Sequence, residues 1–164
     1  YLYELGHRKI GMLVGITEAK PTKDRFIGYK QALKDLNLPY KSEWIFNGKY
    51  SEAGGYQATK KMLQMEDLPT AIFCQSDGMA IGAIRAIEDA GLKVPDDFSL
   101  IGFDDIEVSR YVKPTLTTIA QNKRKMGSSI TQLMMNMMDK SNQDTSPVIL
   151  PVELIKRNSC KEIG

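Results

Sequence analysis

Unbroken apolar runs alternate along the chain with segments whose apolar residues recur on one helical face. The runs are "IGMLVGI" (10–16), "SEWIF" (42–46), "TAIFCQ" (70–75) and "FSLIGF" (98–103). Helical spacing follows the first three runs in Phe26, Tyr29, Leu33 and Leu36, in Tyr56, Met62 and Leu63, and in Ala80, Ala83, Ile84 and Ile87. Strands that are apolar throughout and separated by helices are typical of a parallel sheet covered on both faces. The pattern therefore predicts a doubly wound α/β domain.

The last third of the chain departs from this rhythm. The β-prone run "TLTTIAQ" (115–121) leads into a predicted helix over about 125–140, a polar loop and the strand "VILPVELIK" (148–156). The helix carries an apolar stripe made of Met126, Ile130, Leu133, Met134 and Met137. Such a stripe more often packs in a core, and methionine is also common on adaptable interaction surfaces, so a partner-facing role stays open.

Composition limits the classes of protein that fit. The 164 residues are 42% hydrophobic and 26% charged, which suits one globular domain and excludes a disordered chain. The net charge is +2, without a long run of Lys and Arg, so the chain alone is a poor DNA binder and no membrane partner is expected. Cys74 and Cys160 have neither metal-ligand nor disulfide-framework spacing, which favours a reducing cytoplasm.

Polar side chains gather where the predicted strands end. Ligands of open parallel sheets bind outside the carboxyl ends of the strands. The residues there are Arg25, Tyr50, Ser76, Asp77 and Asp104, with Asp105 directly following. Carboxylates and guanidinium groups pair with vicinal hydroxyls, and an aromatic ring covers the apolar face of a sugar. The set suits a neutral polyhydroxylated ligand.

Several of these residues also have simple structural interpretations. Asp77 can cap the helix over 78–90, and Asp105 can cap a turn after its strand. Arg25 can be a surface residue or an ion-pair partner. Asp104 is harder to explain in this way, because a carboxylate beside an apolar strand is costly unless something pairs with it.

The sequence does not favour an enzyme. His7 precedes the first strand and is expected at the opposite, amino edge of the sheet as a structural or surface residue. No G-x-S-x-G motif occurs, and "GITEAKPTKDR" follows the first strand where a Gly-rich phosphate loop would stand. We therefore expect no catalysis, no cofactor and no metal site.

Longer blocks of the sequence resemble a known family. These are "LGHRKIGMLVG", "DRFIGYKQAL", "PTAIFCQSDGMAIGAIRAIEDAGLKVPDDFSLIGFDD", "PTLTTIAQ" followed by "MG", and "LPVELIKRNS". In this order they resemble the LacI-type (lactose-repressor and galactose-repressor) family of bacterial transcription regulators. The resemblance implies an effector-sensing region of periplasmic-binding-protein fold, with two α/β lobes around a cleft. A helix-turn-helix head normally precedes it.

The resemblance also implies roles for single residues. Arg25, Tyr50, Asp104 and Gln121 match effector contacts of the family. Ser76 stands where the family often has Asn, and its shorter side chain weakens the expectation of direct effector contact there. In the branch controlled by a phosphorylated carrier protein the helix after "TTIxQ" usually offers arginine, whereas this chain has Gln132. A small sugar is therefore the expected effector.

The same resemblance implies that the chain is incomplete. Residues 1–121 and the return strand and tail at 147–164 would form the carboxyl-proximal lobe, and 122–146 would be a crossover helix and loop that pack on the missing first lobe. Operator DNA would be bound only through the missing head, by a cytoplasmic homodimer. An exported sugar-binding protein of the same fold is the alternative. If the helix over 125–140 has lost its first lobe, we expect it to dock on a second copy or to fold back on its own sheet.

Overall fold

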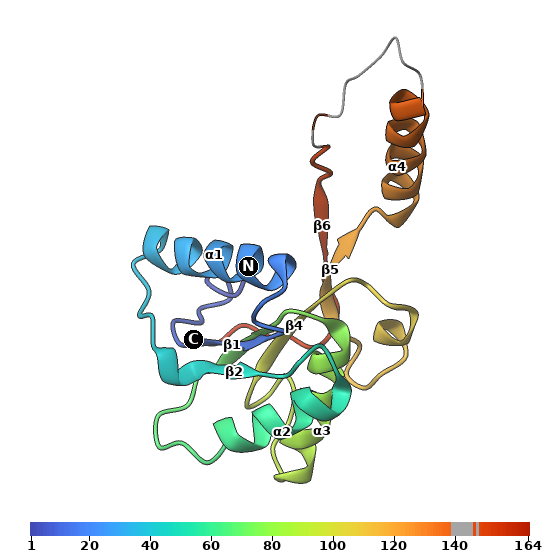
Figure 1. Cartoon of the computed structure of the whole chain (residues 1–164). Helices are drawn as coiled ribbons and strands as arrows, with labels where there is room; N and C mark the ends of the chain where they lie inside the picture. The colour runs from blue at the N-terminus through green and yellow to red at the C-terminus, as the bar shows by residue number, and fades with distance from the viewer. Residues whose placement is uncertain (139–145, 147) are drawn as a thin grey trace.

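The computed structural model describes residues 1–138, 146 and 148–164, and its elements follow the predicted order (Figure 1). The strands are β1 (Ile10–Val14), β2 (Ile45–Asn47), β3 (Ala71–Cys74), β4 (Ser99–Phe103), β5 (Thr117–Gln121) and β6 (Val152–Ile155). The helices are α1 (Lys20–Asp35), α2 (Glu52–Met62), α3 (Asp77–Asp89) and α4 (Lys123–Met138), with short 3-10 turns at Ser42–Trp44 and Glu107–Arg110.

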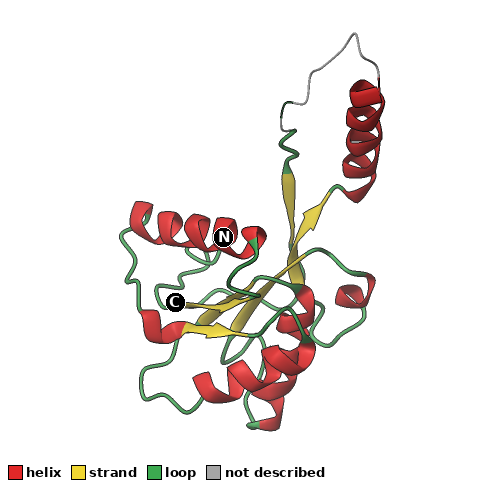
Figure 2. Ribbon diagram, in the orientation of Figure 1, coloured by secondary structure: helices red, strands yellow, loops and turns green. Residues whose placement is uncertain are grey.

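The strands form one twisted sheet in the order β2-β1-β3-β4-β5-β6 (Figure 2). The first five are parallel, and β6 runs antiparallel to β5. The predicted doubly wound parallel sheet is confirmed. The antiparallel strand is the one that returns after α4, so both strands that connect α4 to the domain lie together at one side of the sheet.

Helices cover the sheet on both faces, with α1 on one side and α2 and α3 on the other (Figure 1). Successive side chains of a strand point to opposite faces, and β1 shows this clearly. Met12 and Val14 pack in the cluster beneath α1, while Leu13 packs beneath α2 and α3. This two-sided burial explains why the strands are apolar at every position rather than at alternate ones.

Two glycines allow α2 and α3 to lie in close contact. A Cβ atom at Gly55 would collide with the backbone of Met79, and one at Gly82 would collide with the backbone of Glu52. The contact holds the start of α3 beside the turn that precedes α2. The loops that carry Tyr50 and Ser76 are thereby kept adjacent.

Some predicted boundaries were wrong by a few residues. The strand expected over 42–46 begins at Ile45, because Ser42–Trp44 forms a 3-10 turn that buries Trp44 and lets its indole N–H bond the Asp67 carbonyl oxygen at 2.9 Å. The strand expected over 148–156 is limited to Val152–Ile155. The helix expected over 125–140 spans Lys123–Met138, and its last two predicted residues lie outside the described residues.

Helix α4 stands away from the sheet and from its covering helices (Figure 1). It has no buried residue, and Met134 and Met137 are 60% and 69% exposed. The prediction that its methionine stripe packs in a core was therefore wrong within this chain, and so was the option that the helix folds back on its own sheet. Docking on a second copy stays a prediction.

Candidate functional site at the carboxyl edge of the sheet

Asp104 lies directly after β4 in an unusual backbone conformation. Its φ is 111°, and the next residue, Asp105, has φ 44°, a region that side chains other than glycine rarely adopt. The Asp104 N–H donates to the Ile119 carbonyl oxygen at 2.8 Å, which holds the loop against β5. Strained residues of this kind concentrate at binding sites, where the surrounding structure compensates their cost.

The Asp104 carboxylate has two partners from other elements. Its Oδ1 accepts a hydrogen bond from Nε2 of Gln121, the last residue of β5, at 2.6 Å. The same oxygen lies 3.8 Å from Nη2 of Arg25 on α1. The carboxylate side chain is still 31% exposed, so it can accept further hydrogen bonds from a ligand. The structure thus brings Arg25, Asp104 and Gln121 together.

The Arg25 guanidinium is fixed from three sides. It lies over the ring of Phe103, 3.6 Å from the ring centroid, and its Nη1 donates to the carbonyl oxygen of Gln75 at 2.7 Å. Together with Asp104 these contacts leave the Arg25 side chain 18% exposed. The expectation that Arg25 is an ion-pair partner is met, and the ion pair lies inside the candidate site rather than on a free surface.

Tyr50 approaches the same edge from the turn between β2 and α2. Its φ is 56° and that of Lys49 is 52°, so the turn contains a second pair of left-handed residues. The Tyr50 hydroxyl lies 2.7 Å from the Thr22 Oγ1 at the start of α1. The ring lies against Gly15 at the end of β1, where a Cβ atom would collide with it. Tyr50 is half-buried, with its hydroxyl turned toward the protein.

Ser76 and Asp77 have structural partners. Ser76, not Asp77, is the N-cap of α3, and its hydroxyl accepts from the Met79 N–H at 3.3 Å. The expectation that Asp77 is the cap was therefore wrong. The fully buried Asp77 carboxylate accepts instead from the Ile106 N–H and the Ser109 hydroxyl, each at 2.8 Å, and from the Thr118 hydroxyl. Burial raises the pKa of Asp77, and these three donors oppose the rise.

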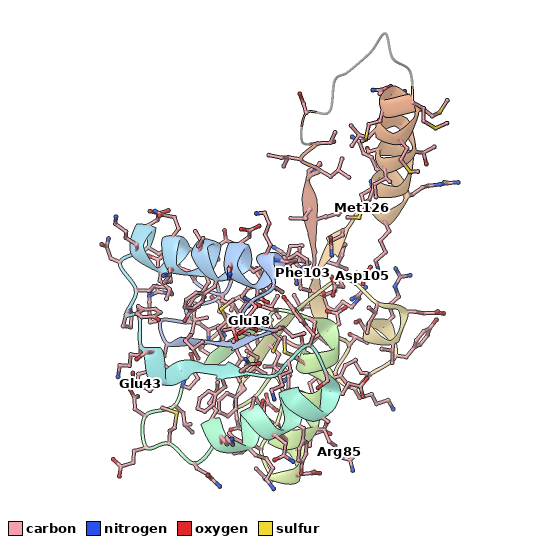
Figure 3. All side chains as sticks on the ribbon, viewed as in Figure 1. Glu18, Glu43, Arg85, Phe103, Asp105 and Met126 are labelled. Carbon is pink, nitrogen blue, oxygen red and sulfur yellow. The ribbon has the colours of Figure 1, made fainter. Side chains whose placement is uncertain are left out.

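Asp105 is an ion-pair residue and not the turn cap that the sequence suggested. Its Oδ1 lies 2.6 Å from Arg157 Nη2, just beyond β6, and its Oδ2 lies 3.3 Å from Arg110 Nη2. Burial raises the pKa of Asp105, but the hydrogen bonds from the two arginines outweigh it, so the net pKa lies below its ordinary value. Figure 3 shows Asp105 and Phe103 at the level where β5 and β6 leave the lobe.

His7 lies at the opposite edge of the sheet, as predicted. It is 1% exposed, and its ring nitrogens lie 2.8 Å from the Thr70 hydroxyl and 2.9 Å from the Ser99 hydroxyl. Burial lowers the pKa of His7, against the opposing effect of the Lys161 carbonyl oxygen. Since the sequence contains a single histidine, none is available as a base at the carboxyl edge.

Sequence reasoning missed Gln75, Phe103 and Arg157. Phe103 ends the run "FSLIGF", and its position directly before Asp104 was a usable signal for an aromatic surface at the site. Gln75 and Arg157 had no such signal, because their partners are distant in sequence.

Across the described residues no group of three or more His, Cys, Asp or Glu side chains is placed to hold a metal ion. None of the described helices is long and apolar enough to cross a bilayer.

Taken together, the edge offers a carboxylate, an amide, a guanidinium and aromatic rings. These groups form hydrogen bonds and stacking contacts, which are the means by which proteins hold small polar ligands. An α/β lobe that presents them beyond the carboxyl ends of its parallel strands defines a small-molecule-binding domain.

Comparison with known proteins gives the family. Residues 1–160 match the model of the periplasmic binding protein-like domain. The chain belongs to this family, as the effector-binding type of domain found in LacI-type regulators, and the resemblance seen in the sequence is confirmed.

Individual relatives support this assignment. The transcriptional repressor PurR of Mannheimia succiniciproducens is 39% identical over the whole chain, which covers 49% of that protein. A lac repressor dimer bound to operator and the anti-inducer ONPF is 32% identical, with a TM-score of 0.91 over 98% of this chain and 55% of that one. A LacI-family regulator from Enterococcus faecium with bound ribose is 31% identical, with a TM-score of 0.89 over 99% of this chain and 60% of that one. The chain thus spans about half the length of the curated relatives it matches.

Proposed function

We propose that this chain is the effector-sensing part of a bacterial LacI-type transcription regulator and that its effector is a carbohydrate. The observation that carries the proposal is the Asp104 carboxylate. It is held in a left-handed backbone conformation between Gln121 and Arg25, and it is still partly exposed beyond the strand ends. The backbone strain at Asp104 is of the kind that concentrates at binding sites, and the exposed part of its carboxylate leaves acceptor capacity for a ligand.

The chemistry of the edge suits hydroxyl groups. Asp104 accepts hydrogen bonds from vicinal hydroxyls, and the Gln121 amide can both donate and accept. The rings of Tyr50 and Phe103 give apolar surface for the C–H face of a sugar ring. The relative with bound ribose supports a carbohydrate of this size. Ser76 and Asp77 act indirectly in this proposal, because their side chains are engaged by α3 and by the segment after β4.

We further propose how the chain is divided between lobes. Residues 1–121 and 147–164 form one lobe, and 122–146 belong to a crossover that packs on another lobe outside this chain. Two observations support the division: β5 and β6 lead to and from α4 side by side, and α4 has no buried residue. The effector would then lie between the carboxyl edge and the second lobe.

In the whole protein, effector binding would control operator DNA through an N-terminal helix-turn-helix head, in a cytoplasmic homodimer. The lac repressor relative was determined as a dimer on its operator, which supports this part. A twofold protein axis matches the symmetry of a palindromic operator. The chain itself has a nearly balanced charge, so DNA contacts are assigned to the head.

Calorimetric titration of the full-length protein tests the effector class. The panel contains ribose, hexoses, disaccharides, sugar phosphates and purine bases, since planar heterocycles also stack on aromatic rings. The proposal predicts saturable binding of a neutral sugar. Binding of a purine base or a sugar phosphate alone would contradict the carbohydrate assignment.

The coding sequence upstream of Tyr1 distinguishes the regulator from an exported binding protein. We expect a helix-turn-helix there, and operator DNA whose affinity changes when the bound sugar is added. A secretion signal in its place would contradict the regulator and favour the exported protein.

A further inference from the structure

Gln75 is a fully buried glutamine directly after β3, at the centre of the candidate site. Its side-chain Oε1 accepts from the Gly15 N–H at 3.0 Å, and its Nε2 donates to the Thr22 carbonyl oxygen at 3.0 Å. A backbone N–H only donates and a carbonyl oxygen only accepts, so these partners fix the orientation of the amide. One side chain therefore ties the end of β3 to the end of β1 and to the first turn of α1.

Two residues of the proposed effector site depend on Gln75. The Tyr50 hydroxyl lies 3.5 Å from Gln75 Oε1 and 2.7 Å from the Thr22 hydroxyl, so the ring is held from within. The main-chain carbonyl oxygen of Gln75, which does not depend on its side chain, accepts from Arg25 Nη1 at 2.7 Å. The aromatic ring and the cation of the site thus share one buried neighbour.

The turn that carries Tyr50 needs such support. Lys49 and Tyr50 are both left-handed, with φ of 52° and 56°, and residues other than glycine adopt this conformation only when the surroundings compensate its cost. The described partners of the Tyr50 hydroxyl are Thr22 and Gln75, both on the protein side of the ring. Tyr50 therefore offers the cleft its ring and keeps its hydroxyl inside.

We propose that Gln75 is a positioning residue of the effector site, whose side chain sets the Tyr50 ring in place without touching the effector. One consequence rests on the proposed function. The Tyr50 hydroxyl should contribute to effector affinity indirectly, through Gln75 and Thr22. With its hydroxyl held by the protein, Tyr50 is a stacking residue, and its ring selects ligands with a flat apolar face.

The first test needs no effector. In the full-length protein with ¹³C-labelled tyrosine, NMR follows the order and chemical shift of the Tyr50 ring. Gln75→Met keeps the length of the side chain and removes both hydrogen-bonding groups. We expect it to shift the Tyr50 signals and to speed ring flipping, whereas Gln57→Met on the exposed side of α2 leaves them unchanged. A lower melting temperature with an unaltered Tyr50 ring would mean that Gln75 only stabilises the fold, and would overturn the proposal.

The second test uses ribose as the probe and measures its dissociation constant. Gln75→Met and Tyr50→Phe should each weaken binding by about 3- to 10-fold, the size expected for one neutral hydrogen bond. Both substitutions remove the same hydrogen-bonded link between Gln75 and Tyr50. The dissociation constant of the double variant should therefore lie within about 2-fold of that of the more weakly binding single variant. Multiplicative losses would contradict the shared role.

The two proposals fail in different ways. If Tyr50→Ala and Asp104→Asn leave ribose binding unchanged, the proposed site is wrong, and the NMR measurement still decides whether Gln75 positions Tyr50. If those variants weaken binding and Gln75→Met does not, the inference about Gln75 alone is wrong.

Discussion

The lobe and helix α4 are both rich in apolar residues, but these residues are buried in the lobe and exposed on α4. In the lobe, strands β1, β3 and β4 are buried at nearly every position, and Leu13, Ile72 and Leu100 are fully buried. In α4, most of the apolar stripe faces water, and Figure 3 shows Met126 at the end of the helix into which β5 leads, with the rest of α4 farther from the sheet. Periodicity therefore shows that a helix has an apolar face, but only the rest of the protein determines what covers that face.

The largest contrast is expected in stability. Leu100→Ala in β4 leaves a cavity in the packed core and should lower the free energy of unfolding by about 2–5 kcal/mol. Met134→Ala on α4 removes a side chain that is already exposed in the single chain and, at a protein concentration too low for self-association, should change the free energy of unfolding by less than about 0.5 kcal/mol. Urea unfolding of the two variants measures both. Equal losses would mean that α4 packs against the lobe in solution.

The junction between the two regions should be the next most sensitive. Arg157 and Asp105 are 13% and 14% exposed, and Arg157→Gln leaves the carboxylate without its closer partner. We expect a loss of about 2–4 kcal/mol in the free energy of unfolding. Lys20→Gln, which breaks the exposed pair with Asp24, serves as the control and should have little effect. Similar small losses in both would show that the junction is not held by this ion pair.

The exposed face of α4 should make the 164-residue chain self-associate. Each apolar side chain left in water forgoes roughly 1.5–3 kcal/mol of burial, and a second copy can supply cover. In sedimentation experiments we expect dimers or larger species for the chain, and monomers once Met134→Lys and Met137→Lys are introduced. If both the wild-type chain and the double variant are monomers, the prediction that a second copy covers α4 is wrong.

The smallest effect should come from the amino edge. The pKa of buried His7 lies below its ordinary value of 6.5, so the folded state keeps the ring neutral while the unfolded chain binds a proton as the pH falls. The contribution of His7 to the free energy of unfolding is therefore fully present above pH 6.5. It declines as the pH drops from 6.5 toward the lowered pKa. Melting temperatures between pH 7.5 and 5.5 should fall more steeply in the wild type than in His7→Gln. Parallel curves would contradict the assignment.

The sequence predicted the lobe well because its signals are local. Unbroken apolar runs and helical spacing located β1, β3 and β4, and the position of Arg25 and Asp104 after strands placed them at one edge. The partners of Asp77 were not predictable in this way, since Ile106, Ser109 and Thr118 come from later segments. The burial of Gln75 depends likewise on Gly15 and Thr22, which only the folded sheet brings near it.

Helix α4 shows the opposite limit. The apolar stripe of α4 and its approximate bounds follow from the sequence. The exposure of the stripe does not, because none of the described residues forms a surface that covers it. The same holds for the effector. Asp104 and Gln121 are proposed to bind hydroxyl groups, while the shape of the ligand depends on both walls of the proposed cleft.

The central claim is that the Asp104 carboxylate binds effector hydroxyls, and one titration addresses it most directly. Asp104→Asn keeps the shape of the side chain and removes its charge, so the affinity of the full-length protein for its sugar should fall by about 1.5–3 kcal/mol with an unchanged melting temperature. Asp24→Asn on the exposed side of α1 provides the matched control and should bind as the wild type does. Unchanged affinity in Asp104→Asn would contradict the account and make the carboxylate a purely structural partner of Gln121 and Arg25.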